Sequence, residues 1–136
     1  MTSLPQRCKS QSTPGWRSPA ALGLAGLLAA AGAAHFVATD AYAEIIPRAL
    51  PAPRAWVYAS GAAELLCAGL VAAPRTRRLG GWLTAGLFVA LFPANVQMAL
   101  DGSIAGGGLL GSPLVAWLRL PLQIPLIAWA VWVARH

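Results

Sequence analysis

Four apolar runs of about 20 residues each constrain this chain more than any other feature of its sequence. They occupy residues 19–38, 55–73, 80–100 and 115–134. A helix of about 20 residues crosses the ~30 Å hydrocarbon layer of a membrane. Runs this long and continuous indicate helices, because the strands of a membrane barrel are shorter and alternate in polarity. The sequence therefore predicts an all-α fold, a four-helix transmembrane bundle.

The charge content argues against a water-soluble domain. Charged residues make up 10% of the chain and hydrophobic residues 57%, whereas a soluble domain carries about 25% charged residues. The net charge is +6, but the basic residues lie in short segments between the apolar runs, so we expect the lipid bilayer and no nucleic acid as partner. Cys8 and Cys67 form no CxxC pair, and the sequence shows no metal-ligand spacing, so we expect no metal site.

The polar segments divide the chain into a tail and one membrane domain. Residues 1–18 are polar and predict a disordered cytoplasmic tail, so the membrane domain is residues 19–136. The connections are a proline-containing segment at 39–54, a basic turn at 74–79 and a glycine-rich segment at 101–114. We expect the loop at residues 45–53 to lie on the outer surface over the bundle.

The distribution of basic residues predicts the orientation. Cytoplasmic segments of membrane proteins are enriched in Lys and Arg. With both termini cytoplasmic, seven of the ten basic residues lie on that side: Arg7, Lys9, Arg17, Arg75, Arg77, Arg78 and Arg135. Tryptophans mark the span ends, as interfacial tryptophans do; these are Trp56, Trp82, Trp117, Trp129 and Trp132. We therefore expect both the N-terminus and the C-terminus to be cytoplasmic.

A second interpretation of the N-terminus stays open. Residues 1–34 resemble a signal peptide, with a basic start, an apolar core and the small residues Ala31, Gly32, Ala33 and Ala34. Cleavage there would leave three spans. We favour retention, because the apolar run reaches spanning length through residues 37 and 38.

Polar side chains inside the apolar runs are the first candidates for a functional site, because an ionisable group in a span costs about 2.5–3.5 kcal/mol on the insertion scale. We call five of them the polar cluster: His35, Glu64, Asn95, Arg119 and Gln123. Odd spans run outward and even spans inward, so His35, Asn95 and Arg119 are expected in the outer half of the bundle. Glu64 and Gln123 are expected somewhat deeper. Ser60 and Gly61, about one turn from Glu64, would let a neighbouring helix approach closely.

These residue types suggest two roles for the cluster: a pocket or path with its own chemistry, or a contact that only holds the helices together. Arg119 is the expected partner of Glu64, because a buried carboxylate needs a positive charge to stay ionised. Asn95 and Gln123 can satisfy further donors and acceptors, and histidine exchanges protons near neutral pH. Such a pocket suits a quinone headgroup, a small anion or a proton path. The alternative is that the cluster only holds the helices together, as interhelical polar contacts do.

The polar residues lie in segments that resemble the DoxX-like family of small bacterial membrane proteins. The segments, in order, are Ala34-His35-Phe36, Ile46-Pro47-Arg48-Ala49-Leu50-Pro51, Tyr58 to Leu65, Pro74 to Arg78, Phe92 to Ala99 and Trp117 to Gln123. The resemblance implies a multi-pass protein of the bacterial cytoplasmic membrane. Some relatives look like subunits of membrane sulfur or thiol oxidoreductases that pass electrons to quinone. His35, Glu64, Asn95, Arg119 and Gln123 carry over as family positions, without a catalytic role.

The function that these observations favour is an accessory or ligand-binding membrane subunit, not catalytic on its own. We expect it to bind a quinone-like or small acidic ligand and to serve a membrane-associated oxidoreductase in a redox or stress-related system. Gly86 and Ala90, four residues apart, permit a homo-oligomer. Two alternatives stay open: a small proton-coupled transporter or channel using Glu64 and His35, and a structural membrane component without a ligand.

Overall fold

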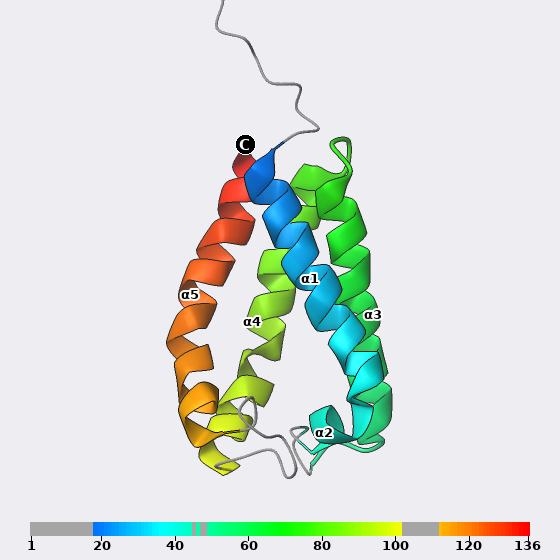
Figure 1. The fold of residues 1–136 in the computed structure, drawn as a ribbon, viewed down its shortest axis with the longest axis vertical. Helices are drawn as coiled ribbons and strands as arrows, with labels where there is room; N and C mark the ends of the chain where they lie inside the picture. The colour runs from blue at the N-terminus through cyan, green and yellow to red at the C-terminus, as the bar shows by residue number, and fades with distance from the viewer. Residues whose placement is uncertain (1–17, 45, 47–48, 102–111) are drawn as a thin grey trace, which may run out of the picture.

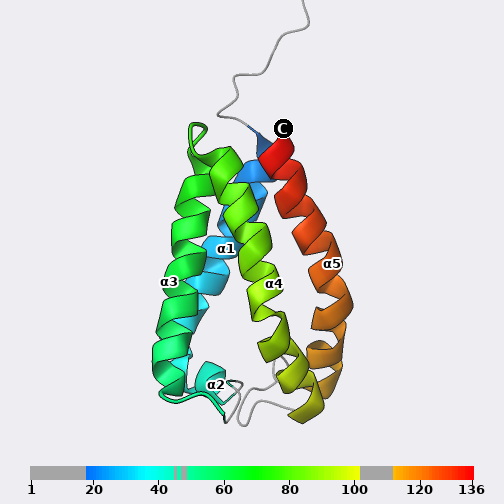
Figure 2. The same ribbon diagram turned by 180° about the vertical axis from the view of Figure 1, so that it is seen from behind.

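The protein is an all-α bundle in a computed structural model that describes residues 18–44, 46, 49–101 and 112–136. The described helices are α1 (Pro19–Val37), α2 (Thr39–Ala43), α3 (Pro53–Ala72), α4 (Arg77–Asp101) and α5 (Pro113–Arg135). Four of them, all except the short α2, are long and apolar enough to cross a membrane. They run side by side along one axis (Figures 1 and 2). The predicted four-helix bundle is therefore confirmed.

Local sequence explains where the helices begin. α1 and α5 each start with a serine followed by proline, and each serine Oγ accepts a hydrogen bond from a backbone N–H three residues on, at 3.4 Å. Proline suits the first helical position, where its missing N–H has no partner to lose. α3 begins after Ala52, which has a left-handed φ of 52°. The Trp56 indole donates to the Pro51 carbonyl at 3.1 Å and braces this turn.

The connection between α3 and α4 is shorter than predicted. α4 begins at Arg77, inside the basic segment expected as a turn over residues 74–79. The hydroxyl of Thr76 donates to the Leu70 carbonyl at 2.9 Å, and Arg77 Nε donates to the Val71 carbonyl at 3.2 Å. These side chains satisfy carbonyls that the last turn of α3 would otherwise leave without donors. Arg77 is therefore a buried helix cap and not only a topology signal.

The segment 39–54 was predicted as a connection, and it contains the short helix α2, which the prediction did not include. The other predicted boundaries lie within three residues of the observed ones. Of the predicted disordered tail, only Ser18 lies within the described residues, and most of the glycine-rich connection lies outside them.

The two ends of the bundle differ in charge. The start of α1, the turn between α3 and α4, and the end of α5 lie together at one end, and α2 lies at the other (Figure 1). We call them the basic end and the α2 end, because Arg75, Arg78 and Arg135 are at the first. Half-exposed tryptophans mark both: Trp82 and Trp132 near the basic end, and Trp56 and Trp117 near the α2 end. Tryptophans at both ends of the bundle match the interfacial tryptophans at the two surfaces of a membrane.

Large apolar side chains cover the outside of the long helices. Leu66 of α3, Val89 of α4 and Ile124 of α5 are each more than half exposed, although they lie well inside their helices. A soluble monomer would not expose so much apolar surface on every helix. With the spanning lengths, this surface makes the chain an integral membrane protein whose solvent is lipid.

Glycines set how closely the helices cross. A Cβ added to Gly61 of α3 would lie 2.7 Å from the Cβ of His35 and 3.1 Å from the Gly32 carbonyl oxygen of α1. A Cβ added to Gly81 of α4 would lie 2.7 Å from the Cβ of Ala134 of α5. The predicted close approach at Gly61 is therefore confirmed, and only residues without a side chain fit at these crossings.

The bundle is filled toward the basic end and hollow toward the α2 end. The main core cluster lies toward the basic end and joins all four long helices; its residues are Ala21, Leu24, Ala25, Leu28, Cys67, Ala68, Val71, Ala85, Ala130 and Val133. A smaller cluster of Met98, Ala99 and Ala116 lies at the α2 end, with Tyr42 packed against it. A cavity lies between the two clusters.

Candidate functional site

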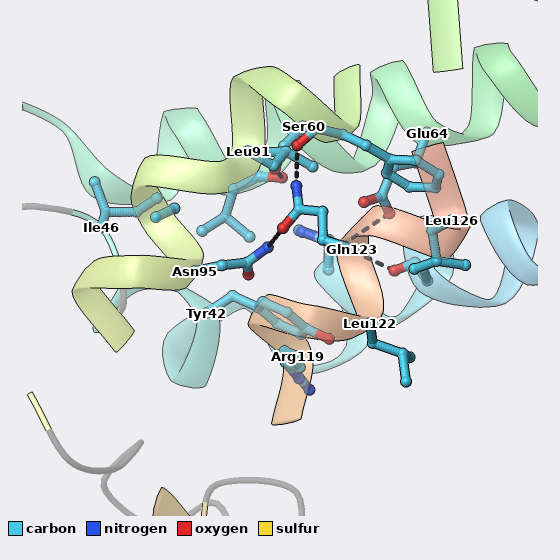
Figure 3. A pocket seen from close by; sticks show the side chains of 15 residues that line it. Tyr42, Ile46, Ser60, Glu64, Leu91, Asn95, Arg119, Leu122, Gln123 and Leu126 are labelled. Atoms are coloured by element: carbon cyan, nitrogen blue, oxygen red, sulfur yellow. Dashed lines mark hydrogen bonds and ion pairs between the residues drawn. The ribbon is translucent and has the colours of Figure 1, made fainter. Parts of the chain in front are cut away.

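The cavity has a volume of about 270 Å³, and all four long helices contribute to its walls. Its polar lining consists of His35, Tyr42, Ser60, Glu64, Asn95, Arg119 and Gln123. The structure thus brings all five residues of the predicted polar cluster to one cavity (Figure 3). Apolar side chains complete the walls, among them Val57, Phe88, Leu91, Leu122 and Leu126. A mixture of apolar walls and a few convergent polar groups is typical of small-molecule sites.

The crossing of α1 and α3 places His35 beside Glu64. Gly32 and His35 lie on one face of α1, and Gly61 and Glu64 lie on one face of α3, three residues apart in each case. Because the glycines let the two helices touch, the next turn brings His35 Nδ1 to 3.4 Å from Glu64 Oε2. The expected pair of Glu64 with Arg119 is not formed, because Arg119 Nη1 instead points to Met98 Sδ at 3.8 Å.

His35 Nδ1 also lies within hydrogen-bond distance of a backbone carbonyl of its own helix. Nδ1 lies 2.8 Å from the carbonyl oxygen of Ala31, which can only accept, so Nδ1 is the donor in that bond. Tyr42 of α2 stacks on the imidazole, with ring centroids 4.3 Å apart. Together these contacts fix the orientation of the imidazole at the cavity wall.

Glu64 has an unsatisfied oxygen. The side chain is buried, with 5% of the residue exposed, and among the described residues Oε2 has no hydrogen-bond partner. A buried polar atom left without a partner costs about 1–3 kcal/mol. Glu64 lines the cavity (Figure 3), so a molecule there meets this residue, although Oε2 itself is covered by protein and takes a new hydrogen bond only when neighbouring side chains move aside.

The two amides of the cluster bond mainly to protein. Asn95 Nδ2 of α4 donates to Gln123 Oε1 of α5 at 2.9 Å, and the Gln123 amide nitrogen donates to the Phe88 carbonyl of α4. Phe88 precedes Val89, whose carbonyl loses its usual helical donor because Pro93 has no N–H. These contacts hold α4 to α5 beside a proline, which is the bundle-locking role for Asn95 and Gln123.

The sequence interpretation did not include two polar lining residues in the cluster. Ser60 had been noted only for its small size, and its hydroxyl donates to the Val57 carbonyl at 3.0 Å. Tyr42 lies in a segment predicted as a connection, and no periodic pattern singles it out. It covers the cavity at the α2 end together with Ile46, which also lines it. Of the loop 45–53 expected over the cluster, residues 45, 47 and 48 lie outside the described part of the chain.

Fold and site together define a multi-pass helical membrane protein with a polar cavity between its spans. Residues 24–134 match the model of a family described as a domain of unknown function (DUF8561), and the chain belongs to that family. The matched range includes every residue of the polar cluster. No curated protein and no solved structure matches the chain.

Proposed function

We propose that the protein is a ligand-binding subunit of the bacterial cytoplasmic membrane that holds a neutral, amphipathic molecule in this cavity. The headgroup carries a carbonyl or a hydroxyl, as a quinone or quinol does. The observation that carries the proposal is the buried Glu64 carboxyl in a cavity with largely apolar walls, where one of its oxygens has no hydrogen-bond partner among the described residues.

A neutral headgroup suits Glu64 in either protonation state. An ionised carboxylate needs a donor, which a hydroxyl supplies, and a protonated carboxyl needs an acceptor, which a carbonyl supplies. A small acidic ligand would bring a second negative charge beside Glu64, with His35 as the nearest basic group. Arg119 also lines the cavity and would attract an anion, so the acidic ligand that the sequence left open stays the alternative.

The packing toward the basic end supports binding over transport. There the buried core is Leu24, Leu28, Val71, Ala130 and Val133, with fractional exposures of 3% or less. Thr84, also buried there, gives its hydroxyl to the Gly80 carbonyl of its own helix. Beyond Glu64, the buried polar side chains in the described part of this core are Cys67 and Thr84, which interact with each other, and apolar core residues surround them. A proton-coupled path would need a polar lining that continues through this core.

Orientation and partner are further parts of the proposal. Because Arg75, Arg78 and Arg135 lie at the basic end, that end faces the cytoplasm and the cavity lies in the outer half of the membrane. Within the described residues, Cys67 is the one cysteine and it is buried. A redox role therefore needs electrons from the ligand or from a partner oxidoreductase, the partner that the resemblance to DoxX-like proteins suggests.

The first test identifies the bound molecule. The protein is purified in mild detergent, its absorption spectrum is recorded, and the extracted small molecules are analysed by mass spectrometry. Glu64→Gln is compared with Asp101→Asn, a matched control that removes an exposed carboxylate outside the cavity. We expect about one ligand per chain in the wild type and in the control, and loss of the ligand in Glu64→Gln. A wild-type protein that is empty after purification and after incubation with membrane lipid extract contradicts the proposal.

The same variant separates a site from a structural contact. Interhelical polar contacts stabilise membrane proteins by about 0.6 kcal/mol on average, so a purely structural Glu64 would make Glu64→Gln less stable. A binding residue with an unsatisfied oxygen should instead leave the ligand-free bundle equally stable or more stable. Unfolding of ligand-free protein, measured for both variants, distinguishes the two roles.

A further inference from the structure

The spacing between α1 and α5 changes along the bundle. Toward the basic end the two helices touch: a Cβ at Gly23 of α1 would lie 3.2 Å from the Trp129 ring of α5. Leu24 and Leu28 of α1 share the main core cluster with Ala130 and Val133 of α5. In this part of the bundle no space separates α1 from α5.

Toward the α2 end the same two helices stand on opposite sides of the cavity. Ala31 and His35 of α1 line the cavity, and so do Leu122 and Leu126 of α5. Figure 1 looks between α1 and α5, with α4 behind them. The two helices thus separate where the cavity begins.

Leu122 shows that the cavity is open on this side. The residue lines the cavity and is also 57% exposed, so it borders both the interior and the outside of the bundle. It lies five residues beyond the interfacial Trp117, which is about 7.5 Å along the helix toward the membrane centre. Leu118, one turn before it on the outside of α5, is also more than half exposed. The opening beside Leu122 therefore faces hydrocarbon, not water.

We infer that the ligand enters the cavity sideways from the bilayer, between α1 and α5, and carries a hydrocarbon tail that stays in this opening. The inference rests on the proposed function and specifies its ligand class: a tailed, lipid-soluble molecule with a hydroxyl or carbonyl headgroup. The headgroup reaches Glu64, while the tail passes Leu122 into the lipid. On the aqueous side, the cavity is partly covered by the stacked rings of Tyr42 and His35.

The test uses two phenols with the same headgroup. Para-octylphenol carries a tail and para-cresol does not, and each is titrated into the full chain in lipid nanodiscs. Leu122→Trp places a large ring in the opening. Ile124→Trp is the matched control, because Ile124 lies on the same helix, is 72% exposed and does not line the cavity. Glu64→Gln reports on the headgroup site itself.

We expect Leu122→Trp to weaken octylphenol binding about tenfold, which corresponds to removing roughly two methylene groups from apolar contact. Cresol binding should change by less than about twofold, and Ile124→Trp should affect neither probe. If Leu122→Trp weakens the binding of both probes equally, or of neither, the lateral entry is wrong. The binding site itself is still supported in that case if Glu64→Gln weakens binding of the probes. If neither probe depends on Glu64, the proposed function fails and the inference fails with it.

Discussion

Gly61→Ala tests how the α1–α3 crossing builds the site. The new Cβ would lie 2.7 Å from the Cβ of His35, and ordinary contact begins at 3.4 Å. The helices must therefore move apart by roughly 0.7 Å at this point. His35 and Glu64 lie on the next turn, so their 3.4 Å contact lengthens as well.

The expected loss of stability follows from two opposing effects. Overpacking at a close contact destabilises a protein by about 1–3 kcal/mol. Replacing a glycine inside a helix by alanine stabilises the helix by roughly 0.5–1 kcal/mol. The net loss should be about 0–2.5 kcal/mol, with a middle value of roughly 1 kcal/mol. Gly69→Ala is the matched control: it lies on the same helix, and a Cβ there meets nothing within 4 Å. It should be neutral or slightly stabilising.

The assay is reversible unfolding of both variants in bicelles by a denaturing detergent, followed by helical circular dichroism, with ligand binding measured in parallel. Gly61→Ala should be less stable than Gly69→Ala and should bind ligand more weakly. Equal stability of the two variants would refute the close crossing, because both gain the same helix propensity.

Three further changes are expected in the same unfolding assay. Gln123→Leu should destabilise the bundle by about 1–2 kcal/mol, because it removes the bond from Asn95 and the one to the Phe88 carbonyl; an unchanged midpoint would contradict that role. Arg77→Gln should cost about 2 kcal/mol, since buried carbonyls of α3 lose their donor. Arg54→Gln should change stability by less than about 1 kcal/mol, because its 2.6 Å pair with Asp40 is exposed.

The fold could be predicted because one physical constraint dominates it. Lipid has no hydrogen bonds to offer the backbone, so each long apolar run must be a helix, and Ser18 and Ser112 mark two of the starts. α2 was missed because its five residues are too few for a periodic pattern to appear. Arg77 was assigned to a turn because its bonds to the carbonyls of α3 depend on a chain reversal that sequence does not specify.

The sequence could predict the membrane depth of the cavity, but not which of its polar residues contact each other. Counting along alternately directed spans places three of the polar residues in the outer half and two somewhat deeper, and the structure brings all five to one cavity. Which of them touch depends on how each helix is rotated. The contact between Gly32 and Gly61 turns His35 toward Glu64, while the Arg119 side chain reaches Met98. In a single sequence, only the small residues indicate how each helix is rotated about its axis.

The carboxyl band of Glu64 tests the central claim most directly. Infrared difference spectra are recorded on the full chain in nanodiscs, before and after adding the ligand identified by extraction, with Glu64→Gln used to assign the band. If the Glu64 carboxyl gains a hydrogen bond from the ligand, a carboxyl or carboxylate band shifts on binding, and the shift is absent in the variant. Ligand bound without any change in that band would show that Glu64 is not its partner and would contradict the account.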